Sequence, residues 1–190
     1  INSIYIEKAL KNVERMIMII DDLVNISMLE SGELALNYKK FDINALVQEV
    51  YESLEMQASA AQTKLAIKEG CDHVFNVYAD EKLIREVLVN LISNAIKYGN
   101  KGGFVHAGFY NMGDNILIEI ADNGLGIAKE QLNRVFERFF RIEKSRSRDM
   151  GGTGLGLSIV KHIIEAHNQN VNVRSTIGEG STFGFTLQKA

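Results

Sequence analysis

Residues 86–98 read EVLVNLISNAIKY, a helical pattern with one apolar side and one polar side. At about 100° per residue the apolar members share one face and predict a helix packed on a core: Val87, Leu88, Leu91, Ile92 and Ala95. The other face carries Glu86, Asn90, Asn94 and Lys97. Carboxylate and amide oxygens suit Mg²⁺, and a lysine one turn further on reaches phosphate oxygens. Asparagine is a poor helix former, which favours a site, but from spacing alone a plain solvent-exposed face stays open.

Two glycine-rich stretches follow this helix. Residues 122–127 read DNGLGI, directly after an alternating stretch, and residues 151–158 read GGTGLGLS, before a further helix. An aspartate at a strand end can accept a hydrogen bond from an exocyclic amine, and glycines let backbone approach a flat ring. Closely spaced glycines that open a helix make an anion site from N–H groups. The second stretch is neither a Walker A loop nor a good dinucleotide fingerprint, so it indicates phosphate binding without naming the nucleotide.

The sequence around these motifs predicts a compact α/β unit from about Phe41 onward. We expect helices at 43–62 (capped by Asp42), 80–98 and 157–167, and strands at 64–69, 74–78, 103–110, 116–121, 171–175 and 181–188. The long segment 125–156, with at most a short helix near 129–136, indicates a lid. The fold class is an α/β sandwich, in which a mixed, mostly antiparallel sheet is covered on one face by helices.

A long helix precedes this unit and runs to about Glu30, where Ser31-Gly32 ends it. Its apolar residues recur at spacings of four and three, which is typical of a heptad seam: Ile6, Leu10, Val13, Ile17, Ile20 and Val24. A second line widens the stripe, as in helices of bundles: Met16, Ile19, Leu23 and Ile26. The alternative is a helix folded back onto its own domain.

Composition excludes several classes of protein. The chain has 190 residues, 46% of them apolar, a length that fits one domain with an extension. Its net charge of −3 leaves no basic face for binding nucleic acid. Its longest apolar run, Met16 to Ile20, is far short of the roughly 20 residues that span a bilayer. A lone cysteine, Cys71, excludes a disulfide framework and a multi-cysteine zinc site. The chain opens with Ile and without a signal peptide, so we interpret it as part of a longer protein.

Together these motifs resemble the histidine-kinase branch of the GHKL ATPases. Residues 86–98 are similar to the N box of that family, 122–127 and 151–161 to its two glycine boxes, 136–141 (FERFFR) to its F box and 180–183 (GSTF) to its last motif. The first helix resembles the second helix of the dimerisation and phosphotransfer bundle. The resemblance implies a Bergerat-type ATP-binding fold, with a bundle helix at 1–31, a linker at 32–41 and the catalytic domain at 42–190.

The same resemblance implies roles for individual residues. Asp122 would accept the adenine amino group, with Gly124, Gly126 and Ile127 shaping the base pocket. Asn90 would hold Mg²⁺, Glu86 and Asn94 would assist it, and catalysis would depend on Glu86, Asn90 and Lys97. Phosphates would be bound by Lys97, Arg134, Arg138, Gly152, Thr153, Gly154, Leu155 and Gly156. Tyr98 would lie against the nucleotide and Thr182 on the strand behind the adenine. Phe139 and Phe140 would either dock on the helical bundle or pack in the core.

The resemblance further implies that ATP supplies its γ-phosphate to a histidine and then to an aspartate of a response regulator receiver domain. Cofactors would be ATP and Mg²⁺, and the full-length protein a homodimer through the first helix, with this region cytoplasmic and the whole anchored in the bacterial inner membrane. The phosphoacceptor box of the family is absent, and none of the four histidines (73, 106, 162 and 167) has its context. We therefore expect ATP binding without autophosphorylation.

Ala128 replaces a proline that often follows the first glycine box, which predicts a looser loop with binding retained. Two alternatives remain open. One is a self-contained GHKL ATPase of the chaperone or topoisomerase type. The other is a nucleotide-sensing module that binds ATP without transferring phosphate.

Overall fold

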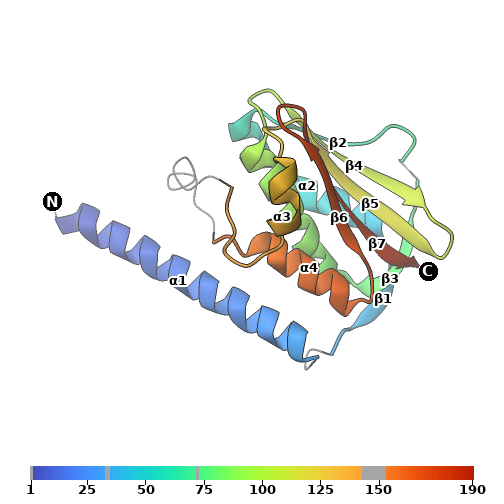
Figure 1. Ribbon diagram of the computed structural model, residues 1–190, viewed down its shortest axis with the longest axis horizontal. Coiled ribbons are helices and arrows are strands. Elements are labelled where there is room, and N and C mark those ends of the chain that lie inside the picture. The colour runs from blue at the N-terminus through green and yellow to red at the C-terminus, as the bar shows by residue number, and fades with distance from the viewer. Residues whose placement is uncertain (1, 33–34, 72, 143–152) are drawn as a thin grey trace.

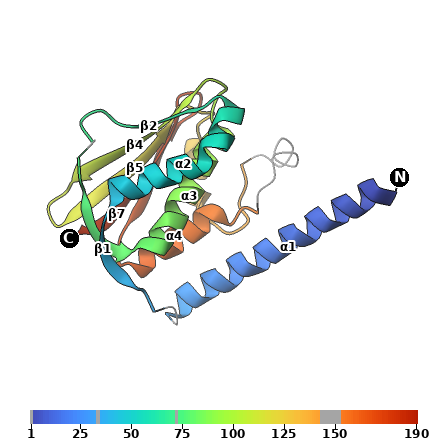
Figure 2. The same cartoon turned by 180° about the vertical axis from the view of Figure 1, so that it is seen from behind.

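The computed structural model describes residues 2–32, 35–71, 73–142 and 153–190. The elements follow one another as α1 (Asn2–Ser31), β1 (Tyr38–Asp42), α2 (Ile43–Ala61), β2 (Lys64–Ile67), β3 (Asn76–Asp80), α3 (Glu81–Tyr98), β4 (Phe104–Asn111), β5 (Asn115–Asp122), the 3₁₀ helix η1 (Lys129–Arg134), α4 (Gly156–Ala166), β6 (Val171–Thr176) and β7 (Gly180–Lys189). Helices α2, α3 and α4 lie together on one side of the sheet, and α1 extends away from the domain (Figures 1 and 2).

The sheet is mixed, as expected. Its strand order is β1-β3-β7-β5-β4-β2, and β6 also pairs with β7. Only the β2–β4 pair is parallel among the pairings of the described residues. β5 and β7 are long central strands whose pairing runs from Asn115 opposite Gln188 to Asp122 opposite Ser181. The predicted α/β sandwich with helices on one face is thereby confirmed.

Alternating side chains of the central strands build the core against the helices. Ile116, Ile118 and Ile120 of β5 are buried, and so are Phe183, Phe185 and Leu187 of β7. They meet the apolar face of α3, where Val87, Leu88 and Ile92 are fully buried. Each such side chain contributes about 1.5–3 kcal/mol through burial. The polar face of α3 is therefore turned away from the sheet.

Local signals set the element boundaries. Asp42 caps α2 by accepting a hydrogen bond from Asn44 N at 3.1 Å, as predicted, and Asp80 caps α3 by accepting from Lys82 N and Leu83 N. The predicted strand 64–69 ends instead at Ile67, because residues 68–71 turn around Gly70 at φ 80°. The short helix expected near 129–136 is the 3₁₀ helix η1. Residues 143–152 of the predicted lid lie outside the described residues.

The two apolar lines of α1 have different surroundings. The heptad seam is exposed, with 47–59% of each residue accessible: Ile6, Leu10, Val13, Ile17, Ile20 and Val24. In the second line Ile26 is completely buried, and Ile19 and Leu23 pack against the domain core together with Leu29. In this structure the second line thus packs on the chain's own domain, as the alternative interpretation predicts for this part of the helix. The end of α1 folds back on its own domain, while Met16 and the seam remain outside.

His167 joins the end of α4 to the start of α3. Its Nε2 accepts a hydrogen bond from the buried Asp80 N–H at 3.0 Å, while Nδ1 lies 2.7 Å from the carbonyl oxygen of Ile163. The first contact needs an unprotonated Nε2, and burial lowers the pKa of the imidazole below its ordinary value. His167 is thus held neutral, with the proton on Nδ1.

We predict that this contact makes stability depend on pH. Because the pKa of His167 is lower in the folded than in the unfolded state, where it is about 6.5, its neutral form stabilises the fold above that pH. This contribution to the free energy of unfolding is lost as the pH falls from about 6.5 toward the pKa of the folded state. Urea unfolding at pH 8 and pH 5.5 measures the difference. In His167→Gln, whose amide oxygen can accept from Asp80 N–H, the difference in unfolding free energy between the two pH values should be smaller than in the parent. The exposed His73, changed to Gln, is the control, and an equal reduction there would contradict the assignment.

Candidate functional site

One end of the candidate site is the carboxylate of Asp122, the last residue of β5. Asp122 has the same orientation in the strand as the buried Ile120, so it faces the helices. Its Oδ1 accepts a hydrogen bond from Gly124 N at 2.8 Å, and the backbone N–H groups of Gly124 and Ser181 favour its ionised form. Burial nevertheless raises the pKa of this group. A carboxylate offers about four acceptor positions, so Asp122 retains capacity for another donor.

The glycines after Asp122 are needed for close contacts within the protein backbone. A Cβ on Gly124 would come within 2.4 Å of the carbonyl oxygen of Tyr98, and one on Gly126, at φ 70°, within 2.0 Å of that of Thr176. Leu125 N–H donates to the Tyr98 carbonyl at 3.2 Å, which ties the loop to the end of α3. Ile127 N–H donates to Ser175 Oγ at 2.8 Å. These glycines thus shape the loop itself, which holds Tyr98 beside Asp122.

The register of β7 changes the assignment of one site residue. Ser181 is opposite Asp122, whereas Thr182 is opposite Ala121 and Arg174. Paired residues of antiparallel strands point to the same face, and neighbours along a strand to opposite faces. Thr182 therefore lies on the face away from the helices, where Arg174 pairs with Glu119 at 2.6 Å. Thr182 thus lies on β7 beside β5, as predicted, but Ser181, which is buried, is the β7 residue on the same side as Asp122.

The other end of the site lies where α3 meets α4. Asn90 Nδ2 donates to the Glu86 carbonyl at 3.0 Å, and this bond orients its Oδ1 toward α4. A Cβ on Gly156, the first residue of α4, would lie 2.6 Å from that oxygen, and 3.9 Å from Asn94 Nδ2. The structure thus brings both asparagines to the start of α4. Lys97, one turn further along α3, has its Nζ 5.1 Å from the centre of the Tyr98 ring.

The start of α4 has the properties of an anion site. Its first helical hydrogen bond runs from Ile159 N–H to Leu155 O at 2.9 Å, so the N–H groups of residues 156–158 precede the hydrogen-bonded helix. Thr153 Oγ1 accepts from Leu155 N at 3.2 Å and fixes the approach to the helix. Gly154, at φ 77°, accepts from Phe139 N at 2.9 Å. Gly152 lies outside the described residues.

The acidic group of this end is Glu86. It is half-buried, and the pKa of its carboxyl is raised, first by burial and next by the nearby charge of Asp22 on α1. No group of three or more His, Cys, Asp or Glu side chains is arranged for a metal ion within the described ranges. A magnesium ion here would depend on the Asn90 oxygen, phosphate and water, with Glu86 acting through water. This donor set fits Mg²⁺, which keeps several waters in phosphate sites.

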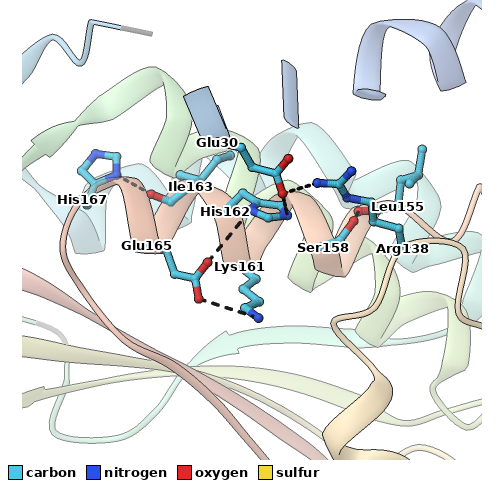
Figure 3. A network of polar contacts seen from close by, with 9 residues as sticks. All are labelled: Glu30, Arg138, Leu155, Ser158, Lys161, His162, Ile163, Glu165 and His167. Atoms are coloured by element: carbon cyan, nitrogen blue, oxygen red, sulfur yellow. Dashed lines mark hydrogen bonds and ion pairs between the residues drawn. The ribbon is translucent and has the colours of Figure 1, made fainter. Parts of the chain in front are cut away.

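The two candidate arginines are paired with carboxylates. Arg134 Nε lies 3.1 Å from Glu137, and its guanidinium lies 4.5 Å from the centre of the Phe140 ring. Arg138 is paired with Glu30 of α1 beside the start of α4 (Figure 3). Phe140 packs against the core, which agrees with the second of the two roles considered for it, core packing and not docking on the bundle. Phe139 is 54% exposed at φ 61°, a conformation that costs a non-glycine residue free energy.

Comparison with known proteins agrees with this geometry. Residues 79–190 match the family described as Histidine kinase-, DNA gyrase B-, and HSP90-like ATPase, and the chain belongs to that family. The sensor-like histidine kinase SenX3 of Mycolicibacterium smegmatis is 37% identical over 183 residues, which are 96% of this chain and 47% of that protein. The chain thus spans less than half of this relative.

Solved structures give the same result for the fold. The histidine kinase AdeS of Acinetobacter baumannii has a TM-score of 0.78 and 29% identity, over 96% of this chain and 83% of that one. Full-length ShkA in complex with AMPPNP has a TM-score of 0.82 and 25% identity, over 95% of this chain and 37% of that one. The expected GHKL fold is confirmed. In the part of the chain that the structure describes, no helix is long and apolar enough to cross a membrane.

We predict that Gly156→Ala weakens nucleotide binding at least tenfold. In a helix alanine is favoured over glycine by about 1 kcal/mol, so propensity alone would make the change stabilising. The added Cβ, however, would push Asn90 away from the start of α4. Titration calorimetry with a nonhydrolysable ATP analogue measures the affinity. Gly184→Ala, whose Cβ meets Asn172 at 3.0 Å on the opposite face of the sheet, is the control. Equal affinities of both variants and the parent would refute this role of Gly156.

Proposed function

We propose that this chain is the ATP-binding catalytic region of a sensor histidine kinase, which supplies the γ-phosphate of ATP to a histidine and thence to a response regulator. The contact of Asn90 with the start of α4 carries this proposal, since it places hard oxygen ligands beside an anion site. Asp122, a specific acceptor for an amino group, completes a site for a base and its phosphates. The names of the relatives, sensor histidine kinases, support the reaction.

In this proposal the base lies at Asp122 and the phosphates at α4. Asp122 accepts a hydrogen bond from the adenine amino group, and Tyr98 and Ile127 flank the base. The N–H groups that open α4, with Lys97 and Arg138, bind the phosphates. Asn90 would hold a magnesium ion, which would supply positive charge to the phosphate oxygens. Phosphoryl transfer needs little covalent participation by the protein, so these residues act mainly through position and charge.

Glu86 is the proposed acid–base group. Its raised pKa brings the carboxyl nearer to neutral pH, where proton acceptance is most effective. The expected acceptor is an imidazole that none of the four histidines of this chain supplies in the family's sequence context. We therefore propose that the chain binds Mg-ATP without forming a stable phosphohistidine of its own.

The exposed seam of α1 is proposed to pair with a second copy of the protein. It is an apolar line of six residues on a helix, and so long an apolar surface is rarely left in water. The exposed Phe139 is proposed to dock on that bundle. A receiver domain is the proposed acceptor of the phosphoryl group, and we place this region in the cytoplasm, with the full-length protein anchored in the inner membrane.

We predict that Asp122→Asn lowers affinity for an ATP analogue by a factor of about ten or more. Asn Oδ1 can still accept from Gly124 N–H, so the fold should be retained, but its NH₂ would oppose the adenine amino group at a cost of roughly 1–3 kcal/mol. Titration calorimetry decides, with the exposed Asp114→Asn as control.

In the full-length protein the same substitution should abolish acid-labile label from γ-labelled ATP. Unchanged affinity would remove Asp122 from the site. ATP binding without any such label in the unsubstituted full-length protein would contradict the kinase reaction and indicate a nucleotide-sensing module.

We predict that Asn90→Ala reduces binding of the analogue more in the presence of Mg²⁺ than in its absence, by at least fivefold. The reason is that the substitution removes the amide oxygen that would bind the ion and leaves the packing of the helix unchanged. Asn90→Asp, which keeps an oxygen at this position, should recover part of the magnesium effect. Equal losses with and without the ion would assign Asn90 to packing alone.

A further inference from the structure

The buried side of α1 presents two carboxylates to the candidate phosphate site. Asp22, Ile26 and Glu30 follow one another at intervals of four residues and so lie along one side of the helix. Ile26, between the two acids, is completely buried, which anchors this side on the domain. The position of the carboxylates is therefore set by apolar packing.

Glu30 reaches two basic groups from different elements. Its Oε1 pairs with Arg138 and lies 3.5 Å from His162 Nε2 on α4, as Figure 3 shows. Arg138 directly precedes Phe139, whose N–H donates to the Gly154 carbonyl. The guanidinium that Glu30 engages is thus tied to the glycine segment that opens α4. The pKa of Glu30 is lowered chiefly by Arg138, so the pair is ionised at neutral pH.

Asp22 makes a second contact of the same kind. Burial raises the pKa of its carboxyl, the neighbouring Thr153 hydroxyl lowers it, and the charge of Asp22 also reaches Glu86. Thr153 belongs to the segment that leads into α4. Asp22 thus acts on Thr153, which precedes Gly154 in the chain. Glu30 acts on Arg138, which precedes Phe139, and Phe139 is hydrogen-bonded to Gly154. In the proposed site, the phosphates of a nucleotide would bind Arg138 and Thr153. The negative charges of Asp22 and Glu30 would repel them.

We propose that docked α1 and nucleotide phosphates compete for Arg138 and Thr153, so that nucleotide binding releases the end of α1. The inference rests on the proposed nucleotide site. Coupling of this kind is reciprocal: a phosphate that binds Arg138 weakens docking by the same factor by which docking weakens the phosphate. Release would free the second apolar line of α1 for other helices, and docking would keep the site in a nucleotide-poor state.

Glu30→Gln tests the proposal, because it removes the charge and keeps the size of the side chain. The variant should bind a nonhydrolysable ATP analogue with Mg²⁺ at least fivefold more tightly than the parent chain, the lower end of typical coupling. Hydrogen exchange of residues 19–31 should be faster in the variant, and in the parent it should become faster when the analogue is added. Glu14→Gln, an exposed acid on the same helix, should change neither quantity.

The outcomes separate the two claims. If the parent binds the analogue and Glu30→Gln binds it equally, competition is refuted and the nucleotide site stands. Exchange of residues 19–31 that the analogue leaves unchanged would also refute release. If neither chain binds the analogue, the proposed function fails, and the inference fails with it. Weaker binding by Glu30→Gln would show instead that Glu30 positions Arg138 for the phosphate.

Discussion

The carboxamide of Asn90 lies against the backbone of Gly156, where an added Cβ would come within 2.6 Å of its oxygen. This contact sets where α4 begins relative to α3. It thereby places the first N–H groups of α4 beside the side-chain oxygen of Asn90. α3 otherwise packs on β4 and β5 and α4 on β6, and the two helices also pack directly against each other. The asparagine–glycine contact and the Phe139–Gly154 hydrogen bond add polar contacts at the start of α4.

The second end of the site depends on the sheet. Asp122 ends β5, and the loop behind it is compact enough that glycine is needed at two positions where backbone meets backbone. The loop is bonded to the last residue of α3 through Leu125 and Tyr98. α3 therefore connects both ends: its C-terminus supports the Asp122 end through Tyr98, and its middle supports the end at α4 through Asn90. One amphipathic helix thus positions the whole candidate site.

Much of this could be predicted from local sequence. Asp42 caps a helix because of hydrogen bonds within a few residues, and the alternation of β5 and β7 predicts two strands with one buried face. The polar face of α3 follows from its period. Which residue of β7 lies opposite Asp122 could not be predicted from local sequence. A shift of one residue would place Thr182 there instead of Ser181, and only the register of the pairing with β5 determines which it is. Similarly, the ion pair of Glu30 with Arg138 spans 108 positions, and no local pattern signals it.

A site that runs from Asp122 to α4 is tested most directly by two-dimensional NMR of the amide-labelled chain during titration with a nonhydrolysable ATP analogue and Mg²⁺. We expect the largest shifts on two separate groups of amides, residues 122–127 at one end and 154–158 at the other, in a single saturable event. A groove of about 460 Å³ between η1, α4 and β6, lined by Leu132, Phe136 and Val173, is the competing location. Shifts centred on that groove, with residues 122–127 unchanged, would contradict a site that runs from Asp122 to α4.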